Sequence, residues 1–342
     1  MRKTKCKRLQ KGCEKMVTIS DIAKELNLSI STVSRAFTNP EMVKEVTRKQ
    51  IIEKADEMGY QVNMIASQLR NKSSKLIALV SLQPRMSWFT DDLLNGAQEY
   101  VREEGYEIVT LNAHNAKVDS ISICERMRFA GIIIAATELG RDVEVKRSKM
   151  LPTVYVNRMS EEGNNILTDD AAGISDLMDY LYSIGHRKIG YISGPENSLN
   201  SVIRLNTFKK KMQEYDLPVR DEWIERGEWM AEDAREAARN ILSLPEYPTV
   251  LVAANDQMCI GVYQAIQEKG LVVGRDISVA GYDNTEFSQW MNPPLTTVSL
   301  PLYEMGQIAA RTLLMKIEGK EEIKKEQIVR GELIIRESTR TV

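Results

Sequence analysis

Seven short apolar runs follow one another along the chain from Leu76 onward, and they constrain the fold more than any other feature. The runs span residues 76–80, 107–111, 131–135, 153–156, 188–192, 249–253 and 277–281. Amphipathic stretches separate several of them, at residues 92–104, 172–184 and 231–242. Ile- and Val-rich strands that alternate with helices predict parallel sheets buried on both faces. The strands are too many for one sheet of usual size, so we expect two doubly wound lobes with a cleft between them.

The segment before these runs has a purely helical pattern. Thr18 and Asp21 form a T-x-x-D sequence that predicts a capping box at the start of a first helix. Asn27 suits the left-handed conformation of a tight turn, and Ser29 can cap a second helix. Residues 46–58 predict a third helix, which ends at Gly59. The apolar positions of this third helix fall on one face, and they are Ile51, Ile52, Ala55 and Met58. We therefore expect the three short helices to share one small core.

The second of these helices has one apolar and one polar face. Val33, Ala36 and Phe37 are expected inside, and the other face carries Ile30, Ser31, Ser34 and Arg35. Thr32, on the same helix, is a further candidate DNA contact. An Arg can donate two hydrogen bonds to a guanine in the major groove, and Ser hydroxyls can bind phosphates or base edges. The pattern favours a helix-turn-helix that reads DNA, with an ordinary helical hairpin as the alternative. Thr18 and Ser29 are also candidate DNA contacts.

Charge is distributed unevenly along the chain. Residues 1–75 hold 16 of the 46 basic side chains but only 8 of the 48 acidic ones, so a basic head precedes an acidic body. Seven of those basic residues lie within residues 1–15, against one acid. This tail is either a disordered arm that touches DNA phosphates or a segment that precedes a true start at Met16.

The sequence predicts neither a metal site nor a membrane span. The cysteines Cys6, Cys13, Cys124 and Cys259 have no paired ligand spacing, and neither His114 nor His186 stands beside a Cys. No run of 18 apolar residues occurs, and the basic N-terminal segment lacks the apolar centre of a secretory signal. We therefore expect a cytoplasmic protein with reduced thiols and no cofactor.

Polar and aromatic side chains follow several predicted strands, where open parallel sheets bind ligands. They are Trp88, Phe89, Asn157, Ser198, Asn200, Arg204, Trp229, Asp256 and Asp283. Carboxylates and Arg suit sugar hydroxyls, and aromatic rings suit a sugar face or a flat base. For each Asp the alternative is a helix cap, and Trp229 can simply pack. Sugar, sugar phosphate and purine stay open, with sugar favoured.

An enzyme is the competing class. The chain contains no Gly-rich phosphate loop, no G-x-S-x-G, no HExxH and no Cys with a credible His partner. Two acids in a cleft would suit a glycosidase, but only in unequal environments. We therefore name no catalytic residue and expect a binding protein. A sugar-binding protein without gene regulation is a further alternative.

Several strings in one order resemble the lactose/galactose repressor family. They are TISDIAKELNLSISTVSRAFTNP from Thr18, GHRKIGYISGP from Gly185, NDQMCIG from Asn255, DISVAGYDN from Asp276 and PPLTTV from Pro293. The resemblance spans about Val17 to Arg340. It implies a DNA-binding head, a hinge, and a core with the fold of periplasmic sugar-binding proteins.

The resemblance also implies roles for particular residues. On composition, residues 63–70 form a plain linker, too short to be helical alone. In the family this hinge folds on DNA as a pair and pushes a leucine into the minor groove, which implies DNA contacts by Asn63, Ala66 and Leu69. The implied effector site includes Asn157, Arg204, Asp256, Asp283 and the aromatic positions. Asn157 stands where several relatives carry an acid, and the segment between Asn112 and Gly131 is about one helical turn short.

The expected organisation follows. Residues 1–15 form the tail, 16–62 the head, 63–75 the hinge and linker, and 76–342 the core. The chain would cross between lobes near residues 173, 299 and 329, which gives one lobe of 76–173 and 300–328 and another of 174–299 and 329–340. The expected function is a repressor whose affinity for a palindromic double-stranded operator responds to a small molecule. The expected assembly is a homodimer, with a tetramer as the alternative.

Overall fold

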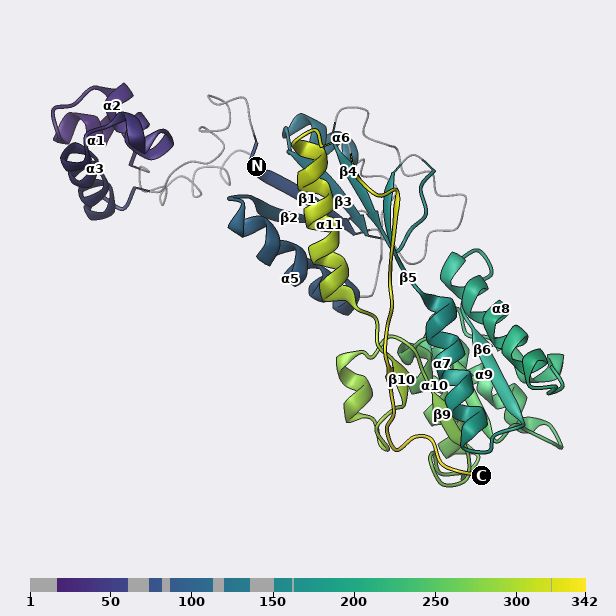
Figure 1. Cartoon of the computed structure of the whole chain (residues 1–342). Helices are drawn as coiled ribbons and strands as arrows, with labels where there is room; N and C mark the ends of the chain where they lie inside the picture. The colour runs from purple at the N-terminus through teal and green to yellow at the C-terminus, as the bar shows by residue number, and fades with distance from the viewer. Residues whose placement is uncertain are drawn as a thin grey trace, which may run out of the picture. The chain divides into compact units, whose positions relative to one another are not determined.

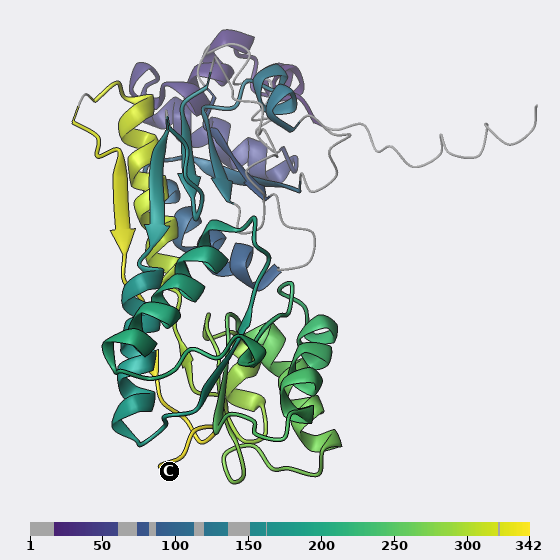
Figure 2. The same cartoon turned by 90° about the vertical axis from the view of Figure 1, so that its right-hand side faces the viewer.

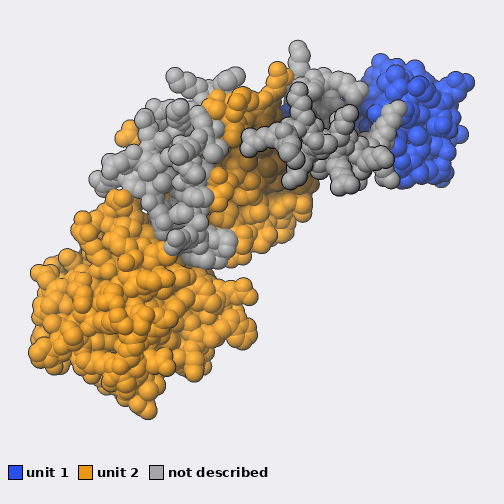
Figure 3. Space-filling view, turned by 180° about the vertical axis from the view of Figure 1, so that it is seen from behind, with its two compact units in different colours: residues 1–74 blue, residues 75–342 orange. Residues whose placement is uncertain are grey.

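The chain contains two compact units, residues 1–74 and residues 75–342 (Figure 3). The computed structural model describes residues 17–60, 74–81, 87–112, 120–135, 151–161, 163–320 and 322–342, with the side chains of Ser87 and Trp88 excepted.

The first unit is a bundle of three short helices, α1 (Ile19–Glu25), α2 (Ile30–Thr38) and α3 (Glu45–Glu57), with a 3₁₀ turn at Pro40–Met42. The predicted caps are confirmed. The Thr18 backbone N–H donates to Asp21 Oδ2 at 2.9 Å, and the Thr32 N–H donates to Ser29 Oγ at 3.1 Å. Asn27 has a φ of 55° and thereby makes the turn between the first two helices possible.

The core of this unit is small and apolar. Its fully buried residues come from all three helices, and they are Ile22, Ala23, Val33, Ala36, Ile51 and Ala55. The expectation that Ile52 is buried was wrong, because its side chain is 40% exposed. Two helices pack against α3 along the stripe of Ile51 and Ala55, and Ile52 lies about 100° around the helix from Ile51. The predicted end of α3 at Gly59 is confirmed by its φ of 67°.

The second unit has a lobe built on a six-stranded parallel sheet in the order β11-β5-β4-β3-β1-β2. The strands are β1 (Leu76–Ser81), β2 (Glu107–Asn112), β3 (Gly131–Ala135), β4 (Thr153–Val156), β5 (Asn164–Thr168) and β11 (Glu326–Val329). Helices α5 (Ser87–Glu103) and α11 (Leu302–Ile317) pack side by side on one face, and α6 (Ser120–Arg126) covers the other (Figure 1). Figure 2 shows β11, in yellow, at one edge.

The other lobe is built on a four-stranded parallel sheet in the order β7-β6-β8-β9. Its strands are β6 (Ile189–Ser193), β7 (Ile224–Arg226), β8 (Val250–Ala253) and β9 (Ser278–Ala280). The helices α7 (Asp170–Ser183) and α8 (Leu199–Glu214) pack together, as do α9 (Ala231–Ser243) and α10 (Asp256–Glu268). Two 3₁₀ turns, Asp221–Trp223 and Glu286–Trp290, complete the lobe. The predicted doubly wound arrangement is therefore confirmed for both lobes.

Three connections join the lobes. The chain passes from β5 to α7 around Asp169, from β10 (Thr297–Val298) to α11, and from β11 to β12 (Leu333–Ile334). β10 and β12 pair antiparallel beside the four-stranded sheet, so two of the three connections are hydrogen-bonded to each other where they leave this lobe.

All seven predicted runs form strands, with ends that differ by two residues or fewer. The strands β5, β10, β11 and β12 were not predicted. β10 and β12 have only two residues each, and β5 and β11 carry polar residues such as Asn164, Asn165 and Glu326. The α5 helix begins at Ser87, five residues before the expected start. The shortened segment before β3 holds α6, which has only seven residues.

The tight contact between α5 and α11 predicts a specific sensitivity. A Cβ atom on Gly306 would lie 2.2 Å from the Leu93 carbonyl oxygen, so Gly306→Ala has to push the two helices apart. We expect a loss of about 1–3 kcal/mol in the free energy of unfolding, and a melting temperature lower by roughly 2–10 °C. Thermal unfolding of purified protein measures this. The control is Arg311→Ala, at an exposed position of the same helix, and an equal shift in both variants would contradict the prediction.

Candidate functional site

The exposed face of α2 is a candidate DNA-reading surface. Ile30, Ser31 and Arg35 are exposed, and Thr32 and Ser34 are half-buried. Ile30 is an apolar residue of this face, and it is 54% exposed. Ser29 Oγ lies 2.8 Å from both Ser31 Oγ and Thr32 Oγ1, and Thr18 Oγ1 lies 2.6 Å from Asp21 Oδ2. Both predicted contact residues Thr18 and Ser29 are thus engaged in helix caps. The hinge residues Asn63, Ala66 and Leu69 lie outside the described residues.

In the second unit, polar side chains from different elements meet at the carboxyl ends of the strands. Asn157 follows β4, Ser198 caps α8, and Asn200 and Arg204 lie on the first turns of α8. Asp283 follows β9, and all of these side chains are buried. The structure therefore brings together predicted residues that lie far apart in the sequence.

Arg204 is the centre of this group and is only 3% exposed. Its Nε donates to Asp170 Oδ1 at 3.0 Å, and its Nη1 donates to the Ala254 carbonyl oxygen at 2.6 Å. Nη1 also lies 3.6 Å from Asp283 Oδ1, and the Tyr282 ring covers the guanidinium at 3.7 Å. Burial alone would lower the pKa of Arg204, but the charges of Asp170 and its neighbours raise it above its ordinary value. The guanidinium is a fixed positive charge with its own counter-ions.

Two amides extend the network toward the other lobe. Asn200 Nδ2 donates to Asn157 Oδ1 at 3.0 Å and to Asp170 Oδ2 at 2.5 Å. Thr168 Oγ1 also donates to Asn157 Oδ1, at 3.3 Å. Because Asn157 and Thr168 belong to the six-stranded lobe, this chain of hydrogen bonds links the two lobes at the base of the cleft.

Asp256 has a structural role in this network. Its Oδ2 accepts from the Thr285 N–H at 2.8 Å, and its Oδ1 accepts from Thr297 Oγ1 at 2.6 Å. The side chain is fully buried, and burial raises its pKa to about 7. Asp256 therefore joins α10, the loop after β9 and the connection at β10. Its neighbour Asn255 is the cap of α10, since its Oδ1 accepts from the Met258 N–H at 2.8 Å.

The loop after β9 has an uncommon backbone conformation. Asp283 has a φ of 115° and Asn284 a φ of 53°. Arg336, near the C-terminus, fastens this loop, because its Nη2 donates to Asn284 Oδ1 and its Nη1 donates to the Leu295 carbonyl oxygen, both at 2.8 Å. Residues outside the usual backbone regions need such support and gather at functional sites. The support fixes where the Asp283 carboxyl points, and burial raises the pKa of that carboxyl well above its ordinary value.

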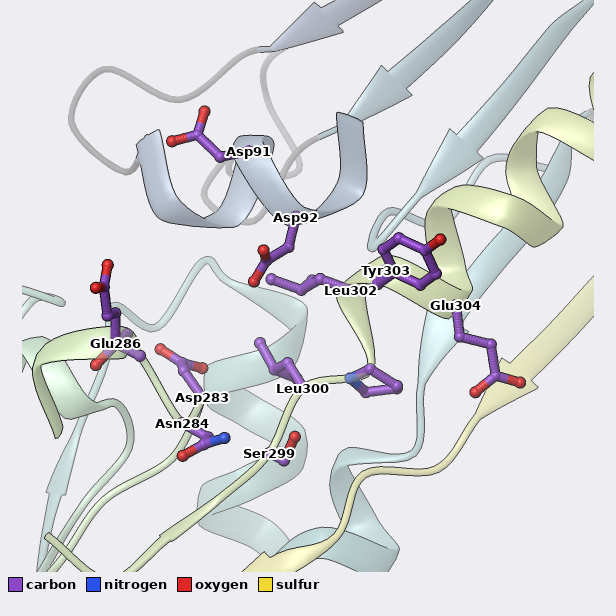
Figure 4. Close-up of a pocket in the computed structure, with 12 residues that line it drawn as sticks. Asp91, Asp92, Asp283, Asn284, Glu286, Ser299, Leu300, Leu302, Tyr303 and Glu304 are labelled. Carbon is purple, nitrogen blue, oxygen red and sulfur yellow. The ribbon is translucent and has the colours of Figure 1, made fainter. Parts of the chain in front are cut away.

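A pocket of about 630 Å³ opens between the two lobes (Figure 4). That volume lies within the range of small-molecule sites. Its lining comes from both lobes and consists of Asp91, Asp92, Asp283, Asn284, Thr285, Glu286, Ser299, Leu300, Pro301, Leu302, Tyr303 and Glu304. Asp283 is the predicted site residue that lines it.

Comparison with known proteins follows the same division of the chain. Residues 18–63 match the bacterial regulatory proteins of the lacI family, and residues 178–339 match the periplasmic binding protein-like domain. The chain is 33% identical to the probable HTH-type transcriptional repressor ExuR of Bacillus subtilis (strain 168), over 95% of this chain and 99% of that protein. The chain belongs to the LacI family.

Other relatives agree with this assignment. The HTH-type transcriptional repressor CytR of Escherichia coli (strain K12) is 29% identical over 96% of this chain and 98% of that protein. Among solved structures, the lac repressor dimer bound to operator and the anti-inducer ONPF superposes with a TM-score of 0.83. It is 27% identical, with 95% of this chain and 100% of that chain covered. The protein is thus a DNA-binding transcriptional regulator of the LacI family.

Several sequence-predicted residues of this LacI-family chain lie away from the pocket. Phe89 is 1% exposed and packs in the core, because α5 begins earlier than expected and turns this residue toward the sheet. Trp229 is buried, with its ring centroid 5.8 Å from the Arg204 guanidinium, and its indole N–H has no partner among the described atoms. Ser198 is also buried, and the Trp88 side chain lies outside the described residues.

Sequence reasoning missed Asp170, Tyr282 and Arg336, which hold the network together. Asp170 follows β5, which was not predicted because its sequence is polar. The acid after this strand was therefore not recognised as a residue at a strand end. Tyr282 is adjacent to Asp283 and could have been found as an aromatic residue at a strand end. Arg336 lies in a C-terminal segment without any motif, and only the fold brings it to the cleft loop.

Within the described part of the chain, no cluster of three or more His, Cys, Asp or Glu side chains has the arrangement of a metal site. No described helix is long and apolar enough to cross a membrane. The thiols of Cys124 and Cys259 are buried and unpaired with each other.

The raised pKa of Asp256 predicts a pH dependence of stability. The folded state keeps a proton on this carboxyl up to about pH 7, whereas the unfolded chain releases it near pH 4. The stabilisation from this proton is therefore present at low pH and is lost as the pH rises through about 7. We expect the melting temperature of the wild type, relative to that of Asp256→Asn, to fall between pH 5 and pH 8. A difference that stays constant over this range would show that Asp256 does not titrate there.

Proposed function

We propose that this protein is a repressor that binds a palindromic operator as a homodimer and changes its operator affinity when a small molecule enters the interlobe pocket. Two surfaces support this proposal, the exposed face of α2 and the polar pocket. A sugar is the favoured ligand, because the pocket is lined by carboxylates and other hydrogen-bonding groups. We expect the protein to act in the cytoplasm, where its operator would lie.

The observation that carries the proposal is the composition of the pocket lining. Asp91 and Asp92 belong to one lobe, and Asp283 and Glu286 belong to the other. A ligand that contacts both sides stabilises one relative position of the lobes over others, and a ligand can shift an equilibrium only through such a difference. The three connections between lobes then carry that change through the core.

The alternatives are a sugar-binding protein and a carbohydrate-active enzyme, both without gene regulation. A glycosidase would need two carboxyl groups that face a substrate. Asp256 instead directs both of its oxygens to Thr285 and Thr297 and has no exposed surface. This arrangement favours a binding protein, as do the repressors among the relatives.

A gel-shift assay tests the proposal. DNA from upstream of the protein's own gene is titrated with protein, with and without each member of a panel of sugars. We expect a specific complex whose affinity changes with one sugar. The Asp283→Asn variant should bind the same DNA within several-fold of wild type but lose the response. Specific DNA binding that no small molecule alters would contradict effector control, and an absence of specific binding would contradict repression.

The exposed position of Arg35 generates a further prediction. Arg35→Ala should lose about 1–3 kcal/mol of discrimination between operator and random DNA, the range for one bidentate contact to a base. The affinity for both DNAs is measured at one fixed salt concentration, because phosphate contacts depend on salt. An equal loss on both DNAs would mean that Arg35 contacts only phosphate.

The hinge at residues 63–70 generates a prediction about coupling. It is too short to be helical alone, so we infer that DNA orders it and that the effector changes the spacing of two hinges in the dimer. A Gly inserted after Arg70 should preserve DNA binding and effector binding separately but uncouple them. Leu69→Ala should weaken operator binding and reduce the effector response. If the insertion variant keeps the wild-type ratio of operator affinities with and without effector, another contact carries the signal.

A further inference from the structure

The pocket is strongly acidic. Five of the twelve lining residues that the structure describes are acidic, namely Asp91, Asp92, Asp283, Glu286 and Glu304, and none of these twelve is Lys, Arg or His. The acids come from both lobes. Figure 4 shows the Asp92 carboxyl pointing from α5 toward the pocket and the Asp91 carboxyl pointing away from it, with Asp283 and Glu286 on the opposite side. Any bound molecule is therefore approached by carboxylates from two directions.

These acids influence one another across the opening. The pKa of Asp92 is raised by partial burial, and then by the charges of its neighbour Asp91 and of Glu286 on the other lobe. Asp92 and Glu286 belong to different lobes, so the negative charge of the pocket comes from both lobes, and the two carboxyl groups repel each other across the opening. Interactions of this kind strengthen when a closing cleft excludes water.

Among the described residues, two arginines beside the pocket loop are already engaged in hydrogen bonds. Arg204 is bonded to Asp170 and to the Ala254 carbonyl oxygen, and it also faces Asp283. An anion could reach Arg204 only in competition with the buried carboxylates of Asp170 and Asp283, and a displaced carboxylate would be left without its charged partner. Arg336 likewise donates to Asn284, Leu295 and Ser288. Neither side chain belongs to the pocket lining.

We propose that the pocket selects an uncharged, hydroxyl-rich ligand and rejects sugar phosphates and sugar acids. Carboxylate oxygens accept hydrogen bonds, and sugar hydroxyls supply donors for them. A phosphate or uronate group would instead place a like charge against them, which discriminates by roughly 100-fold or more in affinity. The inference rests on the proposed function, because it assigns a ligand class to the same pocket.

The charge of the pocket can be measured without knowing the ligand. A single reactive thiol is introduced by Ser299→Cys, in a background where Cys6 and Cys13 are replaced by Ser and where Cys124 and Cys259 are buried. The thiol is treated with a cationic trimethylammonium-ethyl or an anionic sulfonato-ethyl methanethiosulfonate. The reference is Ser183→Cys in the same background, at an exposed position outside the pocket lining.

The labelling rate of each thiol with the cationic reagent is divided by its rate with the anionic reagent. We expect this ratio to be at least about tenfold higher for the pocket thiol than for the reference thiol. The ratio should fall toward the reference value in high salt, and also when Asp92→Asn and Glu286→Gln are added. A pocket ratio within about threefold of the reference overturns the proposal, and so does a ratio that the two substitutions leave unchanged.

A second experiment compares neutral sugars with their anionic forms. Glucose, glucuronate and glucose 6-phosphate, and the same three forms of galactose, are compared by thermal shift on the full chain. Stabilisation by a neutral sugar alone supports the proposal, and equal or greater stabilisation by its acid or phosphate overturns it. If none of these sugars stabilises the protein, the ratio of labelling rates alone tests whether the pocket is selective for charge. A failed gel shift with a high labelling ratio would instead reject gene regulation while the charge selection stands.

Discussion

The buried ion pair between Arg204 and Asp170 is the interaction on which the cleft depends. It joins the first turns of α7 and α8, and the same guanidinium binds the end of β8 and faces the loop after β9. Removing a charge from water is costly, and a buried pair becomes tolerable only when its remaining hydrogen-bonding groups are satisfied. Here Asn200 occupies the second oxygen of Asp170, and the Tyr282 ring covers the guanidinium face. The base of the site is therefore rigid before any ligand arrives.

Much of the fold could be read from the sequence because its signals are local. The caps at Thr18 and Ser29, the turn at Asn27 and the seven apolar strands each depend on neighbouring residues. Of the four missed strands, β10 and β12 are very short and β5 and β11 are polar, so pairing with a neighbouring strand defines all four more than their own hydrophobicity does. Ile52 shows a related limit, because periodicity identifies an apolar face but not how wide a stripe the partner helices cover.

The site was less predictable, because it depends on which side chains satisfy one another. Arg204, Asn200 and Asn157 were found from their positions after strands and do meet in the fold. Asp256 and Asp283 look alike in sequence, since each follows a strand. The first has its oxygens occupied by Thr285 and Thr297, and the second lines the pocket. Only the three-dimensional partners separate a carboxylate that holds the protein together from one that can receive a ligand.

Arg336 holds the loop after β9 in place, so the last segment of the chain helps to shape the pocket. Arg336 lies just beyond β12, which follows the third connection between the lobes, and it grips the residue next to Asp283. The segment that follows the third connection between the lobes therefore also holds the loop that carries Asp283. Through one side chain, Arg336, the placement of that connection and the placement of a residue that lines the pocket depend on each other.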